Sequence, residues 1–305
     1  MNLQTVPPPA TRRLPRAWRA LLHVLLLQGL RPTRRPPPRN RWLDQQHGQA
    51  LTPFVVHGAR GQRLACWRAE PQGVSTEEPV PVVVAVHGWG SHAAMLSSLI
   101  VPLVGAGMAV VLFDAASHGD SSREAFSSLP RFAEDLAAVL EALRRFPALD
   151  TRRVGLLGHS LGGAAVLLHA ARHGEVKCVA SLSSFAHPQE VMERWLRAHR
   201  IPGRWIGAAI LEHVQEVIGE RFDHIAPERQ MARIGCPVLV VHGAQDQTVP
   251  LSDALRLHEA LPRGHGRLLI VDGDHDLRAP LVHRIDELVD FLGMHLGVRA
   301  AAALA

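Results

Sequence analysis

The sequence of 305 residues has no tyrosine, a single lysine at position 177 and only three cysteines. The cysteines lie far apart, at Cys66, Cys178 and Cys236, and none belongs to a Cys-x-x-Cys pair. This spacing argues against a disulfide framework and against a thiolate zinc site, and it favours buried thiols in a reducing compartment. We therefore expect a cytoplasmic protein.

The first 42 residues contain no acidic side chain, although they hold nine of the 33 basic ones. Removing those nine leaves 24 basic residues against 28 acidic ones, so the remaining chain carries a net charge of −4. The overall charge of +5 is positive only because of the tail. An acidic body argues against a nucleic-acid partner. We expect a small-molecule substrate instead.

Long apolar runs are also missing from the sequence. The run in the tail covers residues 20–27, well short of the ~20 residues that a transmembrane helix needs. No Ala-x-Ala site follows it, which argues against a secretory signal. Residue spacing predicts a helix within residues 12–31 and a polyproline-type linker over residues 32–41. This helix either packs on the body, or is a poorly ordered extension, or lies on an anionic membrane surface, and a targeting segment is a further alternative.

Short valine-rich runs alternate with helical patterns from residue 51 onward. Such alternation predicts an α/β fold with a mostly parallel sheet and helices on both faces. Residues 51–56 and 63–68 flank a turn and suggest an opening β-hairpin. Buried strands are then expected over residues 80–86, 109–113, 154–157, 178–182, 238–241 and 268–271, and helices over residues 91–104, 130–146, 163–169 and 277–292.

Residues 186–234 interrupt this alternation with helical spacings and no strand. We interpret residues 185–235 as a small helical cap inserted late in the sheet. The chain then divides into a basic, Pro/Arg-rich N-terminal extension, residues 1–42, and one domain, residues 43–305, that contains the cap.

The motif Gly158-His159-Ser160-Leu161-Gly162 lies between a predicted buried strand and a predicted helix. A serine on such a sharp strand-to-helix turn projects its hydroxyl at the edge of the sheet, where a substrate can reach it. Gly158 and Gly162 leave out side chains where the turn is tight and where the helix passes close to neighbouring strands. The motif alone is a weak signal, and the flanking strand and helix strengthen it.

Ligands bind outside the carboxyl ends of the strands in a parallel sheet. Polar residues follow the first, third, fifth and sixth of the predicted buried strands: His87-Gly88-Trp89-Gly90, Ser160, Asp246 and His275. A nucleophile, a carboxylate and an imidazole thus share one edge, in the chain order Ser, Asp, His.

These motifs resemble those of the α/β-hydrolase superfamily, in particular its short-capped esterase, lipase and peptidase-like members, from about residue 51 to residue 296. Residues 113–121 and 241–250 also match. The resemblance implies an α/β-hydrolase fold with Ser160 as nucleophile, His275 as base and Asp246 as the acid that orients the base. The chain departs from the His-Gly-Gly-Gly loop of some members, and this difference argues against bulky or tertiary-alcohol esters.

The physical roles agree with this assignment. A serine hydroxyl needs an imidazole to take its proton, and a carboxylate holds the imidazole in the correct tautomer. The backbone N–H groups of Trp89 and Leu161 are the candidate oxyanion donors, and Leu161 opens a helix whose positive end favours negative charge. Gly88 belongs to the same oxyanion loop. Alternative carboxylates adjoin the base at positions 272, 274 and 276, but adjacent residues rarely bend back onto a neighbour's ring.

Several other side chains have less specific signals. We expect His159 to pack beside the elbow, and Asp114 and His118 to shape a loop. No spacing typical of metal ligands appears, and the chemistry needs no metal or organic cofactor. Trp195 and Trp205 lie in the predicted cap, where they are candidates for an acyl pocket, although packing in the core is the commoner role of tryptophan.

The sequence therefore predicts a serine hydrolase that cleaves a carboxylic ester with an apolar acyl part through an acyl-enzyme. A thioesterase, an amidase or peptidase, or a cofactor-free perhydrolase would use the same residues. Dehalogenase and epoxide hydrolase chemistry is disfavoured, because those relatives place an aspartate at the elbow. From another class, the chain could be a non-catalytic, membrane-associated binding protein, and the complete set of three residues argues against this alternative.

Overall fold

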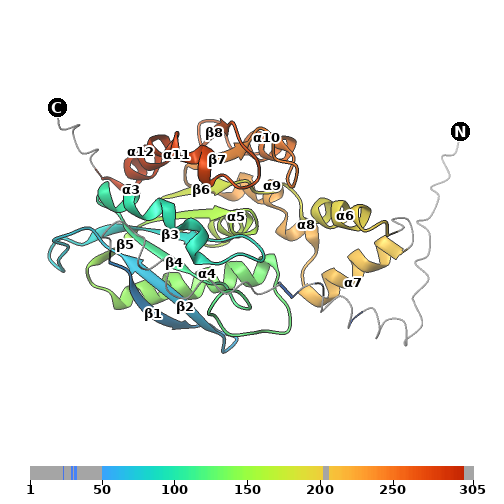
Figure 1. Ribbon diagram of the computed structural model, residues 1–305, viewed down its shortest axis with the longest axis horizontal. Helices are drawn as coiled ribbons and strands as arrows, with labels where there is room; N and C mark the ends of the chain where they lie inside the picture. Colours follow the sequence, from blue (N-terminus) through green and yellow to red (C-terminus); the bar gives the residue numbers. More distant parts are fainter. Residues whose placement is uncertain (1–22, 24–28, 30, 33–49, 202–205, 299–305) are drawn as a thin grey trace, which may run out of the picture.

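The computed structural model describes residues 23, 29, 31–32, 50–201 and 206–298. An eight-stranded sheet runs through the domain in the order β1-β2-β4-β3-β5-β6-β7-β8 (Figure 1). The strands are β1 (Thr52–His57), β2 (Arg63–Ala69), β3 (Val80–Val86), β4 (Ala109–Phe113), β5 (Leu149–His159), β6 (Cys178–Leu182), β7 (Val238–Gly243) and β8 (Gly266–Val271).

The sheet is antiparallel at one edge and parallel through the rest. β1 and β2 form the predicted hairpin, and β2 pairs antiparallel with β4. All the other neighbouring strands, from β4 through β3 to β8, run parallel. β4 and all but the first residue of β3 are buried, as expected for valine-rich strands that are covered on both faces. The predicted α/β fold with a mostly parallel sheet is confirmed.

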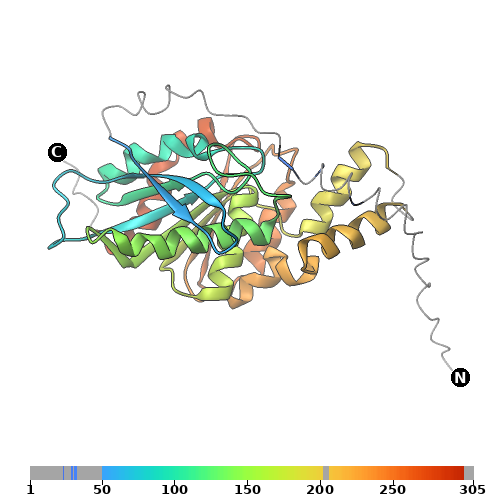
Figure 2. The same cartoon turned by 90° about the horizontal axis from the view of Figure 1, so that it is seen from below.

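Helices cover both faces of the sheet (Figures 1 and 2). One apolar layer includes buried residues of α4, α5 and α10, and the other includes those of η1, α3, α11 and α12. These helices are η1 (Ala93–Leu99), α3 (Ile100–Gly105), α4 (Leu129–Ala142) with η2 (Leu143–Arg145), α5 (Leu161–His173), α10 (Leu251–Glu259), α11 (Arg278–Val282) and α12 (Ile285–Leu296).

Two helices differ from the sequence prediction. The helix expected over residues 91–104 begins as 3₁₀ turns and becomes α-helical only at Ile100. The last helix, expected over residues 277–292, is broken between α11 and α12, where Arg284 has φ −127° and ψ 18°. Leucine and isoleucine keep helical spacing across this break, at positions 277, 281, 285, 288 and 292, so the apolar pattern does not reveal it. Helix α10, between β7 and β8, was not predicted.

The described residues between β6 and β7 contain helices and no strand. These are α6 (Pro188–Ala198), α7 (Ala208–Ile218), α8 (Phe222–Ile225), α9 (Pro227–Gln230) and η4 (Met231–Arg233). In both views α6 and α7 extend away from the sheet (Figures 1 and 2). The helix and linker predicted for the N-terminal tail lie almost wholly outside the described residues. In the part of the chain that the structure describes, no helix is both long and apolar enough to cross a membrane.

Candidate active site

Ser160 lies at the turn from β5 to α5 in a backbone conformation that serine rarely adopts. Its φ is 54° and its ψ is −118°. Two backbone hydrogen bonds hold this conformation: Ser160 N–H donates to Leu182 O at 2.8 Å, and Ala164 N–H donates to Ser160 O at 3.0 Å. Strain of this kind persists only where the surrounding structure enforces it. The turn thus places Ser160 at the carboxyl edge of the sheet, as the motif predicts.

The elbow glycines lie where no side chain fits. A Cβ atom on Gly158 would come within 2.2 Å of Gly162 O, and one on Gly162 would come within 2.2 Å of Val86 O. Both neighbours are backbone atoms, so neither can rotate away. A Cβ on Gly88 would lie 3.1 Å from the Cβ of Ser160, which shows how closely the oxyanion loop approaches the serine.

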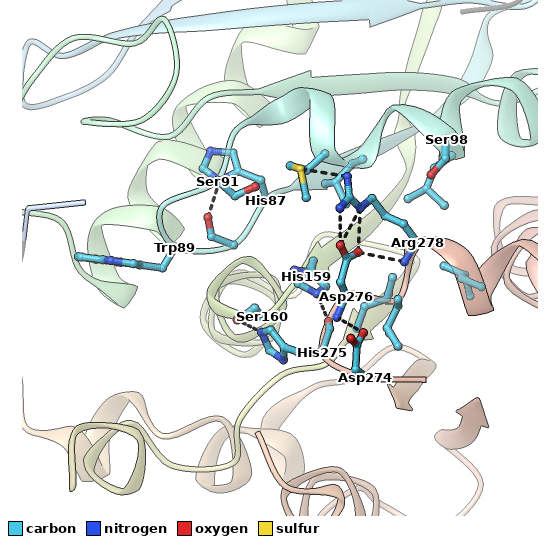
Figure 3. A pocket seen from close by; sticks show the side chains of 17 residues that line it. His87, Trp89, Ser91, Ser98, His159, Ser160, Asp274, His275, Asp276 and Arg278 are labelled. Atoms are coloured by element: carbon cyan, nitrogen blue, oxygen red, sulfur yellow. Dashed lines mark hydrogen bonds and ion pairs between the residues drawn. The ribbon is translucent and has the colours of Figure 1, made fainter. Parts of the chain in front are cut away.

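Ser160, His275 and Asp246 form one chain of hydrogen bonds. The Ser160 hydroxyl lies 3.0 Å from His275 Nε2 (Figure 3). On the other side of the ring, His275 Nδ1 lies 2.7 Å from Asp246 Oδ2. The carboxylate can only accept, so Nδ1 carries the proton and Nε2 is left to accept from the serine hydroxyl. The structure therefore brings the three predicted residues together in the order that proton transfer requires.

Asp246 is buried and held by its own loop. Its Oδ1 accepts hydrogen bonds from the amides of Thr248 and Val249, both at 2.8 Å. Burial by itself would raise the pKa of this carboxyl, but the hydrogen bonds from His275 and from the two amides outweigh burial and lower the pKa below its ordinary value. Asp246 is thus ionised at neutral pH and faces His275 with its other oxygen, Oδ2, which also lies 3.5 Å from His242 Nε2.

The aspartates adjoining His275 along the chain have other partners. Asp274 accepts a hydrogen bond from the Asp276 amide at 3.0 Å, and Asp276 pairs with the guanidinium of Arg278. Asp272 contacts the side chain of Gln245. The structure thus selects Asp246, from a different loop, as the carboxylate that contacts the imidazole.

His159 does more than fill space beside the elbow. Its Nε2–H donates to the carbonyl oxygen of His275 at 2.8 Å (Figure 3). Burial, the largest cause, lowers the pKa of this imidazole, although the hydrogen bond to the His275 carbonyl opposes the shift. The residue before Ser160 thereby fixes the backbone of the loop that carries His275. The sequence prediction placed His159 correctly but gave no indication of this bond.

Of the two candidate oxyanion donors, Leu161 follows Ser160 in the chain, and Trp89 lies in the loop whose Gly88 approaches Ser160. Leu161 is the first residue of α5, and the first amides of a helix have no acceptor within it. Trp89 follows Gly88, the residue whose backbone approaches Ser160. The indole of Trp89 is 39 % exposed and packs edge-on against the ring of His118.

A cavity of about 320 Å³ opens beside Ser160 and His275 (Figure 3). Its apolar wall consists of leucine and methionine side chains from η1, from the end of β6 and from the start of α11: Met95, Leu96, Leu99, Leu182, Leu277 and Leu281. Arg278 lies in the lining, paired with Asp276, and its Nη1 is 3.4 Å from Met95 Sδ. Five of these residues lie in predicted helices and Leu182 lies in a predicted strand, and no sequence signal marks any of them as a pocket residue.

Trp195 was a candidate for an acyl pocket, with packing in the core as the commoner alternative. Among the described residues, those that line the cavity do not include it. Trp195 lies on α6, is 46 % exposed and stacks on the ring of His199 at a centroid distance of 4.1 Å. Helix α6 buries Leu196 instead, and adjacent residues on a helix point about 100° apart. Trp205, the other predicted residue, lies outside the described residues.

No metal site accompanies these residues in the described ranges, where no group of three or more histidine, cysteine, aspartate or glutamate side chains is arranged to hold an ion.

Comparison with known proteins agrees with the fold. The sequence profile of a family described as serine aminopeptidase, S33, matches residues 77–218, which include Trp89 and Ser160 but end before Asp246. The structure superposes on an esterase of Pyrococcus furiosus, Pf2001, with a TM-score of 0.68 and 18 % identity, covering 88 % of this chain and 98 % of the other. The chain has the α/β-hydrolase fold, and its sequence resembles members of that superfamily.

Two curated hydrolases resemble the chain in sequence. Esterase YjfP of Escherichia coli is 27 % identical over 232 residues, which cover 72 % of this chain and 91 % of the esterase. The 2,6-dihydropseudooxynicotine hydrolase of Paenarthrobacter nicotinovorans is 27 % identical over 205 residues, which cover 65 % of this chain and 53 % of that enzyme. These relatives are hydrolases, and they support a hydrolytic function for this chain.

Proposed function

We propose that this α/β hydrolase cleaves a carboxylic ester through an acyl-enzyme formed on Ser160. The observation that carries the proposal is the continuous chain of hydrogen bonds from Asp246 through His275 to Ser160, at 2.7 and 3.0 Å. A serine hydroxyl becomes an effective nucleophile only when a neighbouring base takes its proton. In this arrangement His275 is that base, and Asp246 holds its tautomer.

In the first half of the reaction, Ser160 Oγ attacks the ester carbonyl carbon while its proton passes to His275 Nε2. Asp246 stabilises the imidazolium that forms. The carbonyl oxygen becomes an oxyanion, which accepts hydrogen bonds from the amides of Trp89 and Leu161. The tetrahedral intermediate then collapses, His275 returns the proton to the leaving alkoxide, and the alcohol departs.

In the second half, a water molecule replaces the alcohol. His275 takes a proton from the water, whose oxygen attacks the acyl carbon and forms a second oxyanion at the same amides. Collapse of this intermediate breaks the bond to Ser160 Oγ, which recovers its proton from His275. The carboxylic acid is released and the enzyme returns to its starting state.

The apolar wall of the cavity favours a substrate with an aliphatic acyl part. Ligand cavities bury apolar groups against such walls and use few polar contacts for orientation. The esterases among the similar proteins support an ester substrate over other acyl substrates. The family profile suggests an aminopeptidase as the alternative. A substrate amine would need a carboxylate, and of the two that line the cavity Asp276 is already neutralised by Arg278, while Asp274 accepts one amide hydrogen bond.

The proposal is tested with a fluorophosphonate probe and a panel of substrates. We expect the probe to label the wild type and Ser98→Ala, a control that removes another serine of the cavity lining, but not Ser160→Ala. We expect kcat/KM to be higher for p-nitrophenyl esters of aliphatic acids than for acyl-CoA thioesters or aminoacyl anilides. Unchanged labelling of Ser160→Ala would overturn the assignment, and preference for the anilides would favour the peptidase.

A further inference from the structure

Two buried histidines join the oxyanion loop to the loop that follows β4. His87 begins the oxyanion loop and is 0 % exposed, and His118 lies in the second loop and is 1 % exposed. Their ring centroids are 5.0 Å apart. Both rings pack edge-on against Phe132 of α4, with centroids at 5.6 and 5.1 Å. Apolar packing thus fixes the position of both imidazoles.

Each imidazole accepts one amide hydrogen and lies within bonding distance of one carbonyl. His87 Nε2 accepts from Ala115 N–H at 3.0 Å, and its Nδ1 is 2.7 Å from Gly88 O. His118 Nε2 accepts from Gly90 N–H at 3.1 Å, and its Nδ1 is 3.0 Å from Ala116 O. Because the amides occupy both Nε2 atoms, both rings carry their proton on Nδ1 and donate it to the carbonyls.

These bonds hold the two peptide groups on either side of Trp89. His87 binds the carbonyl oxygen of Gly88, which belongs to the same peptide group as the Trp89 N–H. The C=O and N–H of a planar trans peptide point in opposite directions, so a fixed oxygen also fixes the direction of the amide. His118 binds the N–H of Gly90, which belongs to the next peptide group.

Both rings can make these bonds only when they are neutral, because a protonated imidazole has no acceptor. Burial, the largest cause, lowers the pKa of His87 to about 4 and that of His118 to about 3. Hydrogen bonds to backbone carbonyls raise both values by a smaller amount. The two histidines therefore stay neutral at neutral pH.

The loop that carries His118 is itself anchored. Asp135 of α4 accepts a hydrogen bond from Ala116 N–H at 2.7 Å, and Asp114 accepts from Asp120 N–H at 2.7 Å. Asp114 also accepts from Ala93 N–H at 2.7 Å, at the start of η1. His118 thus binds Gly90 from a loop that is anchored to α4 through Asp135 and to the start of η1 through Asp114.

We propose that His118 is a positioning residue for the oxyanion hole, which acts through Gly90 to hold the Trp89 amide in the direction that the oxyanion requires. The inference rests on the proposed function, because it assigns the Trp89 amide to the oxyanion. His118 is outside the set of described residues that line the cavity, so its effect on turnover passes through the loop, by the Gly90 amide and by the Trp89 indole that packs on its ring, and not through substrate contact of its own.

The test compares three variants. His118→Leu removes both bonds of the imidazole while it keeps an apolar side chain against Phe132. His118→Gln keeps a side-chain oxygen that can accept from Gly90 N–H. The control, His169→Leu, removes another buried imidazole, which lies on α5 and stacks on His173. Its pKa is also lowered by burial, to about 4, so it matches His118 in chemistry. Thermal unfolding of each variant verifies that it is folded.

Two inhibitors separate the oxyanion hole from the rest of the cavity. A trifluoromethyl ketone with a hexyl chain forms a tetrahedral oxyanion with the serine, whereas the matching secondary alcohol does not. Loss of one oxyanion donor costs about 10²–10³ in kcat, and we expect displacement of one donor in His118→Leu to cost about 10- to 100-fold. In the same variant we expect the Ki of the ketone to rise by the same factor, and KM and the Ki of the alcohol to change by less than about twofold. In His118→Gln we expect kcat and the Ki of the ketone to return to within about fivefold of wild type. In His169→Leu we expect wild-type values of all these constants.

The outcomes distinguish this inference from the proposed function. A folded His118→Leu variant with wild-type kcat, or one in which both inhibitors weaken equally, would overturn the inference and leave the ester hydrolase intact. A wild-type protein that neither labels with the fluorophosphonate nor hydrolyses any ester would overturn both.

Discussion

Asp246 uses its two carboxylate oxygens for different purposes. Oδ1 accepts from the amides of Thr248 and Val249, and Oδ2 faces the imidazole of His275. An asparagine at this position has only one acceptor oxygen, and the two amides already require it. In Asp246→Asn the NH₂ group would therefore face His275 Nδ1 and donate to it, which would force the imidazole proton onto Nε2 and remove the base.

We predict that Asp246→Asn lowers kcat by about 10³–10⁴ with little change in KM, as expected for a triad with the wrong tautomer. Steady-state hydrolysis of a p-nitrophenyl ester measures both constants. Asp272→Asn is the matched control, because it removes a carboxylate from the same edge that contacts Gln245 and not the imidazole, and it should retain kcat within about threefold. Equal losses in the two variants would contradict the role of Asp246.

The residues at the sheet edge could be predicted from sequence, whereas the cavity could not. Ser160, Asp246 and His275 each follow an apolar run, and strand ends in a parallel sheet meet at one edge. No comparable rule predicts which side chains line a pocket. Trp195 and Leu196 are neighbours with similar hydrophobicity, yet α6 buries only the leucine, because the choice depends on where the helix packs.

At the scale of single elements, Arg60 of the β1–β2 turn pairs with two carboxylates of α4, exposed Glu134 and buried Asp135. Asp135 has a side-chain exposure of 1 % and accepts from Arg60 Nη2 at 2.7 Å and from Gln62 Nε2 at 2.8 Å. Burial, the largest cause, raises the pKa of Asp135, although the Ala116 amide and Arg60 oppose it. The carboxylate therefore depends on its partners to remain charged.

We predict that Arg60→Met lowers the free energy of unfolding, because it leaves the Asp135 carboxylate buried without its cation. Breaking a buried pair costs about 3–5 kcal/mol, and the 22 % exposure of Arg60 places the loss near the lower end. Urea unfolding measures it. The double variant Arg60→Met/Asp135→Asn should lose less stability than the sum of the two single variants. Strict additivity would show that the pair contributes nothing.

Helix boundaries were predicted less well than strands, for a physical reason. Four strands, over residues 80–86, 109–113, 178–182 and 238–243, begin where the predicted apolar runs begin, because burial on both faces leaves a continuous apolar signal. The exception among the parallel interior strands is β5, which begins at Leu149, five residues before the predicted run, in a polar and partly exposed segment. A helix break leaves no comparable signal when the apolar spacing continues through it, as it does between α11 and α12. The bend at Arg284 is visible only in the backbone angles.

At the scale of the whole molecule, buried neutral histidines make stability depend on pH. Burial, the largest cause, lowers the pKa of His87 and of His169 to about 4 and that of His118 to about 3. In the unfolded chain each would titrate near about 6.5. Below that pH the unfolded state binds protons that the folded state does not, so stability falls as pH falls. The stability that depends on these neutral histidines is fully present above their pKa in the unfolded state, and it is lost progressively as the pH falls to their pKa in the folded state.

We predict that the free energy of unfolding decreases from pH 7.5 to pH 4.5 by on the order of 2 kcal/mol for each of these histidines. The raised pKa values of Asp114 and Asp135 act in the opposite direction in the carboxylate range. His169→Leu isolates one imidazole from this background. Urea unfolding across the range should give a shallower decrease in this variant than in the wild type, and parallel curves would argue against a neutral His169 in the fold.

Alternation of strands and helices predicted the parallel sheet but not the order of its strands. β3 lies between β4 and β5, so the chain crosses over after β3 and returns past it. Sequence alternation carries no information on such a crossing, because any parallel neighbour satisfies it. The outward extension of α6 and α7 depends in the same way on contacts that a local pattern does not contain.

The helices between β6 and β7 separate Ser160 from the two residues that would activate it. A nascent chain that has assembled β1 to β6 holds the nucleophile but neither Asp246 nor His275, which follow β7 and β8. Such an intermediate would have a serine but no base to activate it. Hydrolytic activity during refolding would therefore appear only when the last two strands dock, later than the secondary structure of the first six. In this protein catalysis would report the completion of folding.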